Sequence, residues 1–449
     1  MNTSTLTGQI ALPVTPSDSA PDSESKHPPK AALKSILVAC SGNVVEWFDF
    51  FAYAFTALYF APAFFPSGDP TTQLLNTAGI FAAGFFMRPV GGWLIGRIAD
   101  RKGRRQSMVL SVMLMCLGSL MIAVIPTYAQ IGIWAPVLLL VARLLQGLSV
   151  GGEYGTSATY LSEVATARTR GFYGSFHYAT IIAGQLLAVM VVAILQYVLS
   201  ADELRAWGWR IPFYIGAAVA VIALVLRRGM HESSNRQHRD HAHAGTLRGM
   251  FQHPREVLLV MGFTAGGSLL FYTLNSYMQK YMVNTAHMDP KLSSNIMTAA
   301  LFIFMILQPL FGILSDKIGR RKQMLAFSTF FIVFTVPVLQ LLGHTTDPWI
   351  ALALMVFMLL GMSLYTSISG LLKAELFPIG VRAMGVGLPY AVANAMFGGT
   401  AEYIALWLKT QNMAGIYFWY VAAMAVMLLV CSLQLPHASQ NTHLDRDHH

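Results

Sequence analysis

Residues 96–106 read GRIADRKGRRQ, and residues 312–323 read GILSDKIGRRKQ. In both stretches an aspartate is followed three residues later by a glycine and then directly by two arginines. Each stretch joins the second and third long apolar runs of its half of the chain. Two polar loops of one pattern in matching positions indicate a chain built from two copies of one unit.

A second pair of residues repeats in the same order. Glu163 and Arg170 lie seven residues apart after the fourth apolar run, and Glu375 and Arg382 lie seven apart after the tenth. The one long polar stretch between apolar runs covers 229–254 and follows the sixth run. We therefore expect two halves of six segments each, joined by a polar linker.

Most of the chain consists of apolar runs of about 20 residues, long enough at ~1.5 Å per residue to cross ~30 Å of hydrocarbon. Hydrophobic residues make up 55% of the chain and charged residues only 11%, which excludes an ordinary soluble domain. The runs are apolar on all sides, so we expect helices and not barrel strands. The expected spans are 33–65, 73–96, 107–127, 134–161, 172–199, 210–228, 256–282, 292–315, 324–342, 349–373, 384–409 and 414–435.

Basic residues are sorted between alternate loops. The net charge of +9 could point to a nucleic-acid partner, but the basic residues form no continuous patch, so none is expected. The loops after the second and eighth runs are rich in Lys and Arg, whereas 66–72, 126–133 and 343–348 contain neither. The positive-inside rule then predicts that the basic loops and both termini are cytoplasmic.

The expected fold is an all-α membrane protein with 12 transmembrane helices in two pseudo-symmetric six-helix bundles. Duplicated bundles of this kind place a substrate site near the bilayer midplane between the halves and work by rocking one half against the other, so transport is the expected function. The expected divisions are a disordered cytoplasmic tail at 1–32, a first bundle at 33–228, a cytoplasmic linker at 229–254, a second bundle at 255–435 and a cytoplasmic tail at 436–449.

No cofactor, metal site or enzyme chemistry is expected. We find no nucleophile with a nearby base on one helix face. The linker histidines could bind a metal in principle, but a flexible polar segment lacks the supporting hydrogen bonds that fix metal ligands. These histidines are His231, His238, His241 and His243.

The loop at 96–105 resembles the signature of the major facilitator superfamily, and its second copy lies where that family keeps one. Four segments are similar to the metabolite:proton symporters within the superfamily. They are SGNVVEWFDFFAYAF at 41–55, GFFMRPVGGWLIGRIADRKGRR at 84–105, RLLQGLSVGGEYG at 143–155 and AELFPIGVRAMGVG at 374–387. The resemblance implies a proton symporter in the bacterial inner membrane.

Among these symporters the resemblance favours α-ketoglutarate as the substrate. Citrate, another dicarboxylate, shikimate and a zwitterionic osmolyte are alternatives, and a transporter-like metabolite receptor is the rival from another class. Moving a dianion into a negative-inside cell costs about 4.6 kcal/mol per 100 mV, which co-transported protons offset. The expected partners are a small carboxylate, protons and the lipid bilayer, and the protein is expected to be a monomer.

Charges inside the spans are few, and each costs at least ~2.5–3.5 kcal/mol on insertion scales, so each is expected to face a partner or a cavity. Glu46 and Asp49 lie on nearly one face of the first span, and close carboxylates in a low dielectric suit a proton carrier. The alternative is that they are structural anchors. Glu402 is a further candidate proton site, and the resemblance ties the motif of Arg143 and Glu153 to proton coupling.

Arg88 in the second span is the first candidate for substrate binding, because a guanidinium grips a carboxylate through two parallel hydrogen bonds. The alternative is a structural ion pair with Glu46 or Asp49. Lys373 could bind the second carboxylate of a dianion, and its alternative is a lysine that snorkels to the cytoplasmic rim. The other candidates, chosen as polar residues within the spans, are Tyr53, Gln185, Tyr390 and Asn394. His177 is set aside as a lone polar residue that satisfies its helix neighbours.

The two matched loops predict a cytoplasmic gate. Their charges can pair across the halves in one state and separate in the other, and their glycines permit a tight reversal of the chain. The alternative is that the basic residues only fix the orientation in the membrane. The predicted gate residues are Asp100, Gly103, Arg104, Asp316, Gly319, Arg320, Glu163, Arg170, Glu375 and Arg382.

Overall fold

The structure is a computed structural model and describes residues 29–67, 70–166, 168–229 and 245–436. Within these ranges all regular structure is helical. The first half contains α1 (Pro29–Phe64), α2 (Pro70–Lys102), α3 (Arg104–Val124), α4 (Tyr128–Ile131), α5 (Trp134–Val164), α6 (Arg170–Val198), α7 (Ala201–Ala206), η1 (Gly208–Arg210) and α8 (Ile211–Arg228). The second half contains α10 (Leu247–Phe251), α11 (Pro254–Tyr272), η2 (Thr273–Tyr277), α12 (Met278–Asn284), α13 (Pro290–Ile318), α14 (Arg320–His344), α15 (Pro348–Thr366), α16 (Ser369–Ala374), α17 (Arg382–Ala393), η3 (Asn394–Gly398), α18 (Ala401–Thr410) and α19 (Ala414–Leu433).

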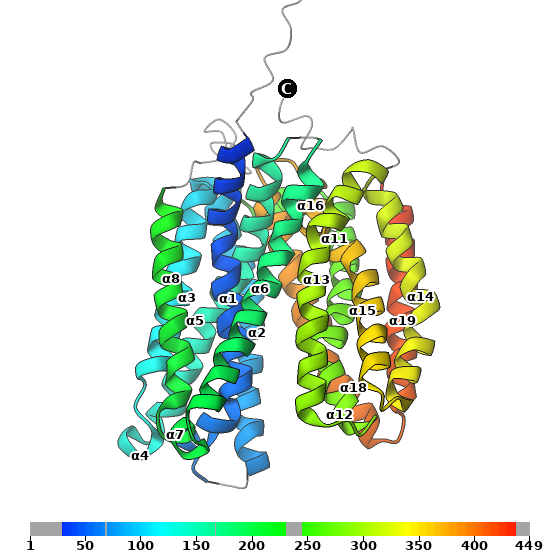
Figure 1. The fold of residues 1–449 in the computed structure, drawn as a ribbon. Helices are drawn as coiled ribbons and strands as arrows, with labels where there is room; N and C mark the ends of the chain where they lie inside the picture. The colour runs from blue at the N-terminus through cyan, green and yellow to red at the C-terminus, as the bar shows by residue number, and fades with distance from the viewer. Residues whose placement is uncertain (1–28, 68–69, 167, 230–244, 437–449) are drawn as a thin grey trace, which may run out of the picture.

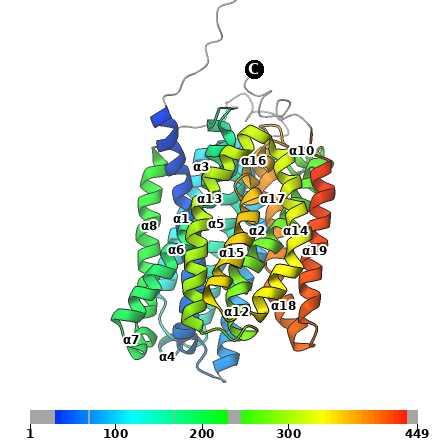
Figure 2. The ribbon, with the colours of Figure 1, turned by 45° about the vertical axis from the view of Figure 1, so that its right-hand side comes forward.

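The helices form two bundles that stand side by side (Figure 1). The first bundle, blue to green, is built from the first-half helices, and the second, green to red, from the second-half helices. The expected all-α, two-bundle architecture is confirmed. We call the end at which α1 begins and α19 ends the terminal end, and Figure 2 shows the short α10 lying there too.

Nine helices in the described ranges are long and apolar enough to cross a membrane. The other expected spans correspond to α1, α2 and the run from α17 to α18. Many large apolar side chains on the outer faces are exposed, such as Phe86 at 75% and Trp349 at 77%. A surface this apolar is expected where lipid, and not water, surrounds the helices.

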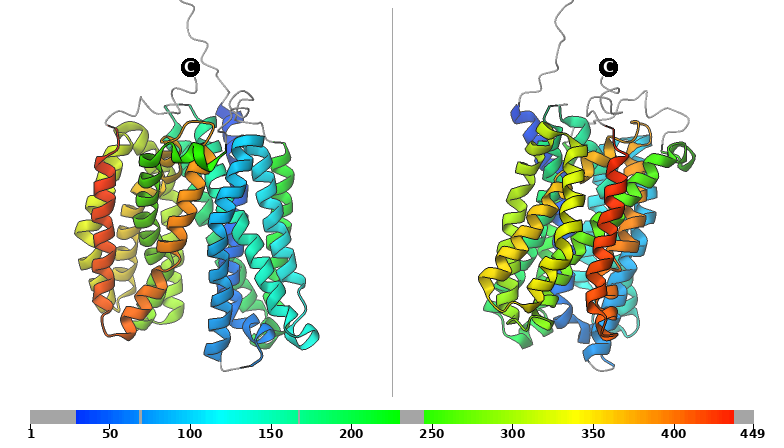
Figure 3. Two further views of the ribbon diagram at one scale, coloured as in Figure 1. Left: turned by 180° about the vertical axis from the view of Figure 1, so that it is seen from behind. Right: turned by 90° about the vertical axis from the view of Figure 1, so that its right-hand side faces the viewer.

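The bundles meet along helices that are far apart in the sequence. α6 packs on α13, and α2 and α5 pack on α17. In the left view of Figure 3, seen from behind, α2 and α17 are the neighbouring blue and orange ribbons. Gly155 of α5 lies so close to α17 that an added Cβ would come within 2.6 Å of the Ala383 carbonyl oxygen. Glycine is therefore required where these two helices cross.

Two helices of the second bundle are interrupted by π-helical segments. Thr273–Tyr277 lies between α11 and α12, and Asn394–Gly398 lies between α17 and α18. A π-helical turn is rare and is found mostly at functional positions, because it shifts the backbone hydrogen-bond register. The two segments identify the places where this bundle departs from regular helices.

Parts of the expected divisions fall outside the described residues. These include 1–28 of the N-terminal tail, 230–244 of the linker with all four of its histidines, and 437–449 of the C-terminal tail. The expected boundaries of the domains therefore stay predictions. Within the expected linker the described residues form α10, capped by the Thr246 hydroxyl, which accepts a hydrogen bond from the Gly249 N–H.

Candidate functional site: a cation pair between the bundles

Arg88 projects from α2 into the contact between the two bundles and is 3% exposed. Its guanidinium lies 3.8 Å from the centre of the Phe85 ring and 5.4 Å from that of Phe50. One Nη donates a hydrogen bond of 3.3 Å to the hydroxyl of Tyr272 in the second bundle. Arg88 is therefore held mainly by aromatic faces, which attract a cation but do not neutralise it.

Lys373 approaches the same contact from α16 and is fully buried. Its Nζ donates hydrogen bonds to the Tyr154 hydroxyl at 2.9 Å and to Ser369 Oγ at 3.0 Å. The Tyr154 ring, from the first bundle, stacks on the Tyr390 ring with 3.4 Å between centroids. Lys373 lies within 4.8 Å of both ring centres, so it too is surrounded by tyrosines.

Neither cation has a carboxylate within 4 Å among the described residues. The expected alternative of an Arg88 ion pair with Glu46 or Asp49 is not found, because those carboxyl groups form hydrogen bonds with Ser149 and Ser119 instead. The rim position considered for Lys373 is not found either, since its side chain is buried. A buried charge without a counter-charge is costly, so this arrangement favours binding of an anion.

Asp49 lies in a second cluster, inside the first bundle. Its Oδ2 accepts a hydrogen bond from the Ser119 hydroxyl, which in turn accepts one of 3.2 Å from the Gln146 amide. Arg143 donates a hydrogen bond of 2.6 Å to Gln146 Oε1 and lies 4.4 Å from the centre of the Tyr53 ring. The arginine is thus connected to the carboxylate through two neutral side chains.

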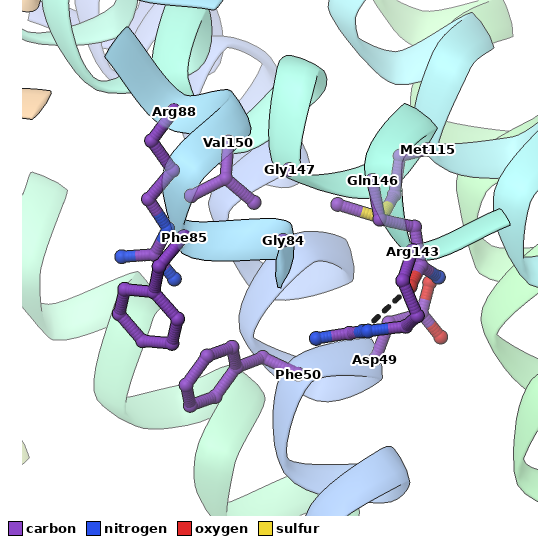
Figure 4. A pocket seen from close by; sticks show the side chains of 10 residues that line it. All are labelled: Asp49, Phe50, Gly84, Phe85, Arg88, Met115, Arg143, Gln146, Gly147 and Val150. Carbon is purple, nitrogen blue, oxygen red and sulfur yellow. Dashed lines mark hydrogen bonds between the residues drawn. The ribbon is translucent and has the colours of Figure 1, made fainter. Parts of the chain in front are cut away.

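A small cavity lies between this cluster and Arg88 and is lined by residues of both. Figure 4 shows Arg88 beside Phe85 on one side of the cavity and Asp49 with Arg143 on the other. Asp49 Oδ1 has no hydrogen-bond partner and lies against Gly216 of α8, where an added Cβ would come within about 2.1 Å of it. The carboxylate is therefore placed between the cavity and α8.

Glu46, one helical turn before Asp49, has a separate environment. Its Oε1 lies 3.0 Å from Ser149 Oγ, and Ser149 Oγ lies 2.8 Å from the Ser111 carbonyl oxygen. The sequence placed Glu46 and Asp49 on one helix face, but their partners lie on different neighbouring helices.

Glu153 forms a fully buried ion pair with Arg227, which sequence reasoning missed. Arg227 donates hydrogen bonds to both Glu153 oxygens and to the carbonyl oxygens of Ala39 and Met108. In the sequence Arg227 follows the apolar run of α8 next to Arg228, where it looks like a residue of the membrane surface. The packing of α8 on α3 and α1 brings it inside the bundle.

The first matched loop contacts the other bundle at the terminal end. Asp100 accepts backbone hydrogen bonds from Ala383 at 3.1 Å and Met384 at 2.9 Å, in the first turn of α17. Its own-half partner is Arg104, at 2.5 Å. Burial raises the pKa of Asp100 to about 6, against the opposing effect of Arg104, so the carboxylate is mostly ionised at pH 7. An ionised carboxylate at a helix N-terminus is a favourable contact.

The second loop repeats this arrangement with the bundles exchanged. Asp316 accepts hydrogen bonds from the backbone of Gly171 at 2.7 Å and Phe172 at 2.9 Å, in the first turn of α6. Its own-half partner is Arg320, at 3.2 Å. Each loop therefore caps a helix of the opposite bundle, and we call this pair of contacts the double cap.

Two glutamates extend the double cap. Glu163 accepts hydrogen bonds from Arg104 at 3.1 Å and, across the bundles, from Arg382 at 3.0 Å. Glu375 pairs with Arg320 at 3.3 Å. Gly103 and Gly319 begin α3 and α14 with φ of 110° and 88°, a region that only glycine enters easily. The structure thus brings the predicted gate loops into contact across the bundles, and Arg170 begins the helix that Asp316 caps.

Other candidate residues are dispersed. Tyr53 donates a hydrogen bond of 3.0 Å to the Thr77 carbonyl and belongs with Arg143, away from the cation pair. Gln185 is buried, and its Oε1 has no partner. Asn394 is buried at the start of η3, one turn after Tyr390. The side chain of Glu402, in α18, lies outside the described part of the structure.

His177, set aside in the sequence, is also buried in the contact region. The Asn43 amide donates to its Nδ1 at 3.2 Å, which leaves the proton of a neutral ring on Nε2. The ring meets Tyr154 edge-on at 4.8 Å. A polar residue at this place could not be found from the sequence, because α6 shows no periodic pattern that separates it from other buried positions.

The two helical bundles are joined by the double cap, and buried cations from both bundles lie at their contact. This arrangement is that of a secondary transporter and not of an enzyme. The chain belongs to the Major Facilitator Superfamily, whose family model matches residues 39–400 and 268–444. The chain is therefore a multi-pass membrane transporter of this superfamily.

Relatives and solved structures agree with this assignment. The chain is 60% identical over 401 residues to the alpha-ketoglutarate permease of Escherichia coli (strain K12), covering 89% of this chain and 93% of that protein. It is 32% identical to the citrate-proton symporter of Klebsiella pneumoniae, covering 90% and 92% of the two chains. The structure of the proton:xylose symporter XylE matches with a TM-score of 0.71 at 17% identity, covering 93% of this chain and 99% of that one, which shows the shared fold.

Proposed function

We propose that this protein takes up α-ketoglutarate together with protons across a bacterial inner membrane. The observation that carries the proposal is the pair of buried cations, Arg88 and Lys373, which come from opposite bundles and have no carboxylate within 4 Å among the described residues. A dicarboxylate supplies two negative charges to meet them. The 60% identical relative that is named for α-ketoglutarate supports this substrate over other dianions.

Binding of a dianion would join the two bundles at their contact. Arg88 would hold one carboxylate through its fork of N–H donors, and Lys373 the other as a point charge. Tyr390 connects the two ends, since it stacks on Tyr154 beside Lys373 and lies within electrostatic range of Arg88. An empty site leaves both cations uncompensated, so the substrate favours the state in which the bundles close around it.

Glu46 and Asp49 are the proposed proton carriers. The Ser149 hydroxyl has one proton but lies within hydrogen-bond distance of both Glu46 and the Ser111 carbonyl. Both contacts are hydrogen bonds at once only when Glu46 is protonated and donates to Ser149. Asp49, at the cavity that also reaches Arg88, is placed to exchange its proton as the substrate arrives.

Arg143 and Glu153 would support these carriers. When Asp49 loses its proton, the charge of Arg143 is close enough to stabilise the carboxylate through Gln146 and Ser119. Glu153, already neutralised by Arg227, holds α5 in position beside Glu46. Glu402 stays a candidate proton site in the second bundle.

The double cap is the proposed gate. It holds the terminal end closed, and its ten polar and glycine residues match between the halves. Exposed Arg101, Lys102 and Arg105 lie at the same end, which supports a cytoplasmic location of that end and of both termini. We propose that this structure is closed to the cytoplasm and that the protein works as a monomer, since both cations and both loops lie in one chain.

The proposal is tested by uptake of radiolabelled α-ketoglutarate into right-side-out membrane vesicles, with and without an imposed proton gradient. Unlabelled α-ketoglutarate, citrate, succinate, shikimate and betaine are the competitors. We expect gradient-dependent uptake that α-ketoglutarate blocks at the lowest concentration. Gradient-dependent uptake blocked best by another competitor would keep proton symport and reject the substrate, and absence of any uptake would reject transport of these solutes.

A further inference from the structure

The side chain of Asn394 is fully buried, and neither its amide nitrogen nor its amide oxygen has a hydrogen-bond partner among the described residues. Leaving a buried amide unsatisfied is unfavourable, so its presence calls for an explanation, and a ligand that completes its hydrogen bonds provides one. Asn394 is the first residue of η3, where the helical hydrogen-bond register changes. Its unsatisfied amide therefore coincides with a break in the helix.

The amide lies next to the part of the site that Arg88 occupies. A Cβ added to Gly398 would come within 2.8 Å of Asn394 Oδ1 and within 2.7 Å of the Tyr272 ring, so the amide and that ring are neighbours. The hydroxyl of the same tyrosine accepts the hydrogen bond from Arg88. Asn394, Tyr272 and Arg88 thus form a continuous group across the contact between the bundles.

Asn275, in the other π-helical segment, provides a comparison. Its amide nitrogen donates a hydrogen bond of 2.9 Å to the Phe271 carbonyl in its own helix, and only its oxygen is without a partner. One N–H of the Asn275 amide is therefore already used within its own helix. Asn394 differs from it in having an amide nitrogen available to a ligand.

We propose that Asn394 recognises the carbonyl oxygen at C2 of the substrate by donating a hydrogen bond to it from its amide nitrogen. The inference rests on the proposed function, because it assumes a dicarboxylate held by Arg88 and Lys373. In α-ketoglutarate the C2 carbonyl adjoins one carboxylate, so an amide beside the arginine that holds this carboxylate is suitably placed. A dicarboxylate with a methylene at C2 leaves the buried donor unsatisfied and binds more weakly.

The test compares α-ketoglutarate with glutarate, which has the same two carboxylates and no C2 carbonyl. Competition against labelled α-ketoglutarate in vesicles gives the affinity ratio of the two solutes for each protein. The free energy of one neutral hydrogen bond corresponds to a preference of roughly 3- to 12-fold for α-ketoglutarate over glutarate in the native protein. Asn394→Leu, which matches the shape of the amide, is expected to reduce the preference to near unity by weakening α-ketoglutarate and leaving glutarate almost unchanged.

Asn275→Leu is the matched control and is expected to keep the native ratio. Stabilisation of each purified variant by glutarate in a thermal unfolding assay shows that it is folded and binds a dicarboxylate. If Asn394→Leu does not fold, Asn394→Ser, whose hydroxyl is too short to reach, is expected to lose the preference in the same way. A native ratio in either folded Asn394 variant, or no preference in the native protein, overturns the inference. Failure of the native protein to bind either solute rejects the proposed function instead.

Discussion

The two bundles repeat one fold but distribute their charges differently. The interior of the first bundle contains carboxylates and arginines from α1, α5 and α8, namely Glu46, Asp49, Arg143 and the Glu153–Arg227 pair. Among the described side chains of the second bundle, Lys373 is the charge buried away from the double cap, and its neighbours are tyrosines and a serine. The π-helical segments of the described chain are both in the second bundle.

The difference indicates that the two bundles took on separate roles after the duplication. Titratable groups need rigid, well-partnered surroundings to keep their proton affinities, and the first bundle provides them. A site that must open and recognise a neutral carbonyl benefits from irregular helices and uncharged donors, and the second bundle provides those. Only the double cap keeps the same residues in both copies, because closing one end requires equal contacts from both sides.

The largest effect is expected from the proton carriers. Asp49→Asn and Glu46→Gln are each expected to abolish accumulation of substrate against its gradient, while exchange of internal for external substrate continues. The reason is that an amide cannot take up a proton, although it can keep a neutral hydrogen bond. Uptake driven by a proton gradient, measured beside counterflow, separates the two activities.

Glu402→Gln is the counterpart from the second bundle and is expected to keep accumulation. Loss of accumulation in this variant alone, with normal accumulation in the Asp49 and Glu46 variants, would move the proton chemistry to the second bundle and remove the contrast.

The buried ion pair of the first bundle predicts a large loss of stability. Glu153→Gln is expected to lower the free energy of unfolding by roughly 3–5 kcal/mol, because Arg227 then stays buried without a counter-charge. Denaturant unfolding of the purified protein in detergent measures this change. The double variant Glu153→Leu with Arg227→Met is expected to recover most of the loss, and a double variant as unstable as the single one would contradict the explanation.

Both bundles are expected to contribute equally to substrate affinity at the cation pair. Arg88→Gln and Lys373→Gln are each expected to weaken α-ketoglutarate binding by roughly 10- to 150-fold, since each removes a charge-assisted hydrogen bond. Equilibrium binding to the purified protein measures the affinity. A monocarboxylate should lose affinity strongly in one variant and little in the other; equal small losses in both would show that neither cation binds substrate.

The double cap should give the smallest effects and the most symmetric ones. Asp100→Asn and Asp316→Asn each remove a negative charge from a helix N-terminus, a contact that contributes about 0.5–2 kcal/mol. Both are expected to shift the protein toward a state open at the terminal end. Distances between spin labels on the two loops report the shift, and an effect from only one of the two variants would contradict the reciprocal arrangement.

The sequence alone was enough to predict the fold. Lipid cannot satisfy backbone polar groups, so runs of apolar residues have to be helices, and their number and the repeated loops give two bundles. The two matched loops could also be found, because the requirement for glycine at positive φ and for paired charges leaves a pattern that is the same in both halves of the sequence. These features depend on local chain properties, which a sequence records directly.

The tertiary structure decided which charges meet. The sequence put Glu46 beside Asp49, but helix packing gives each its own serine on another helix and brings Arg227 inside from the end of an apolar run. It also leaves Arg88 and Lys373 with no carboxylate within 4 Å among the described residues, although Glu46, Asp49 and Glu153 lie in other spans of the first bundle. Which side chains become partners depends on how helices rotate and cross, and those angles are set by packing between segments far apart in the chain.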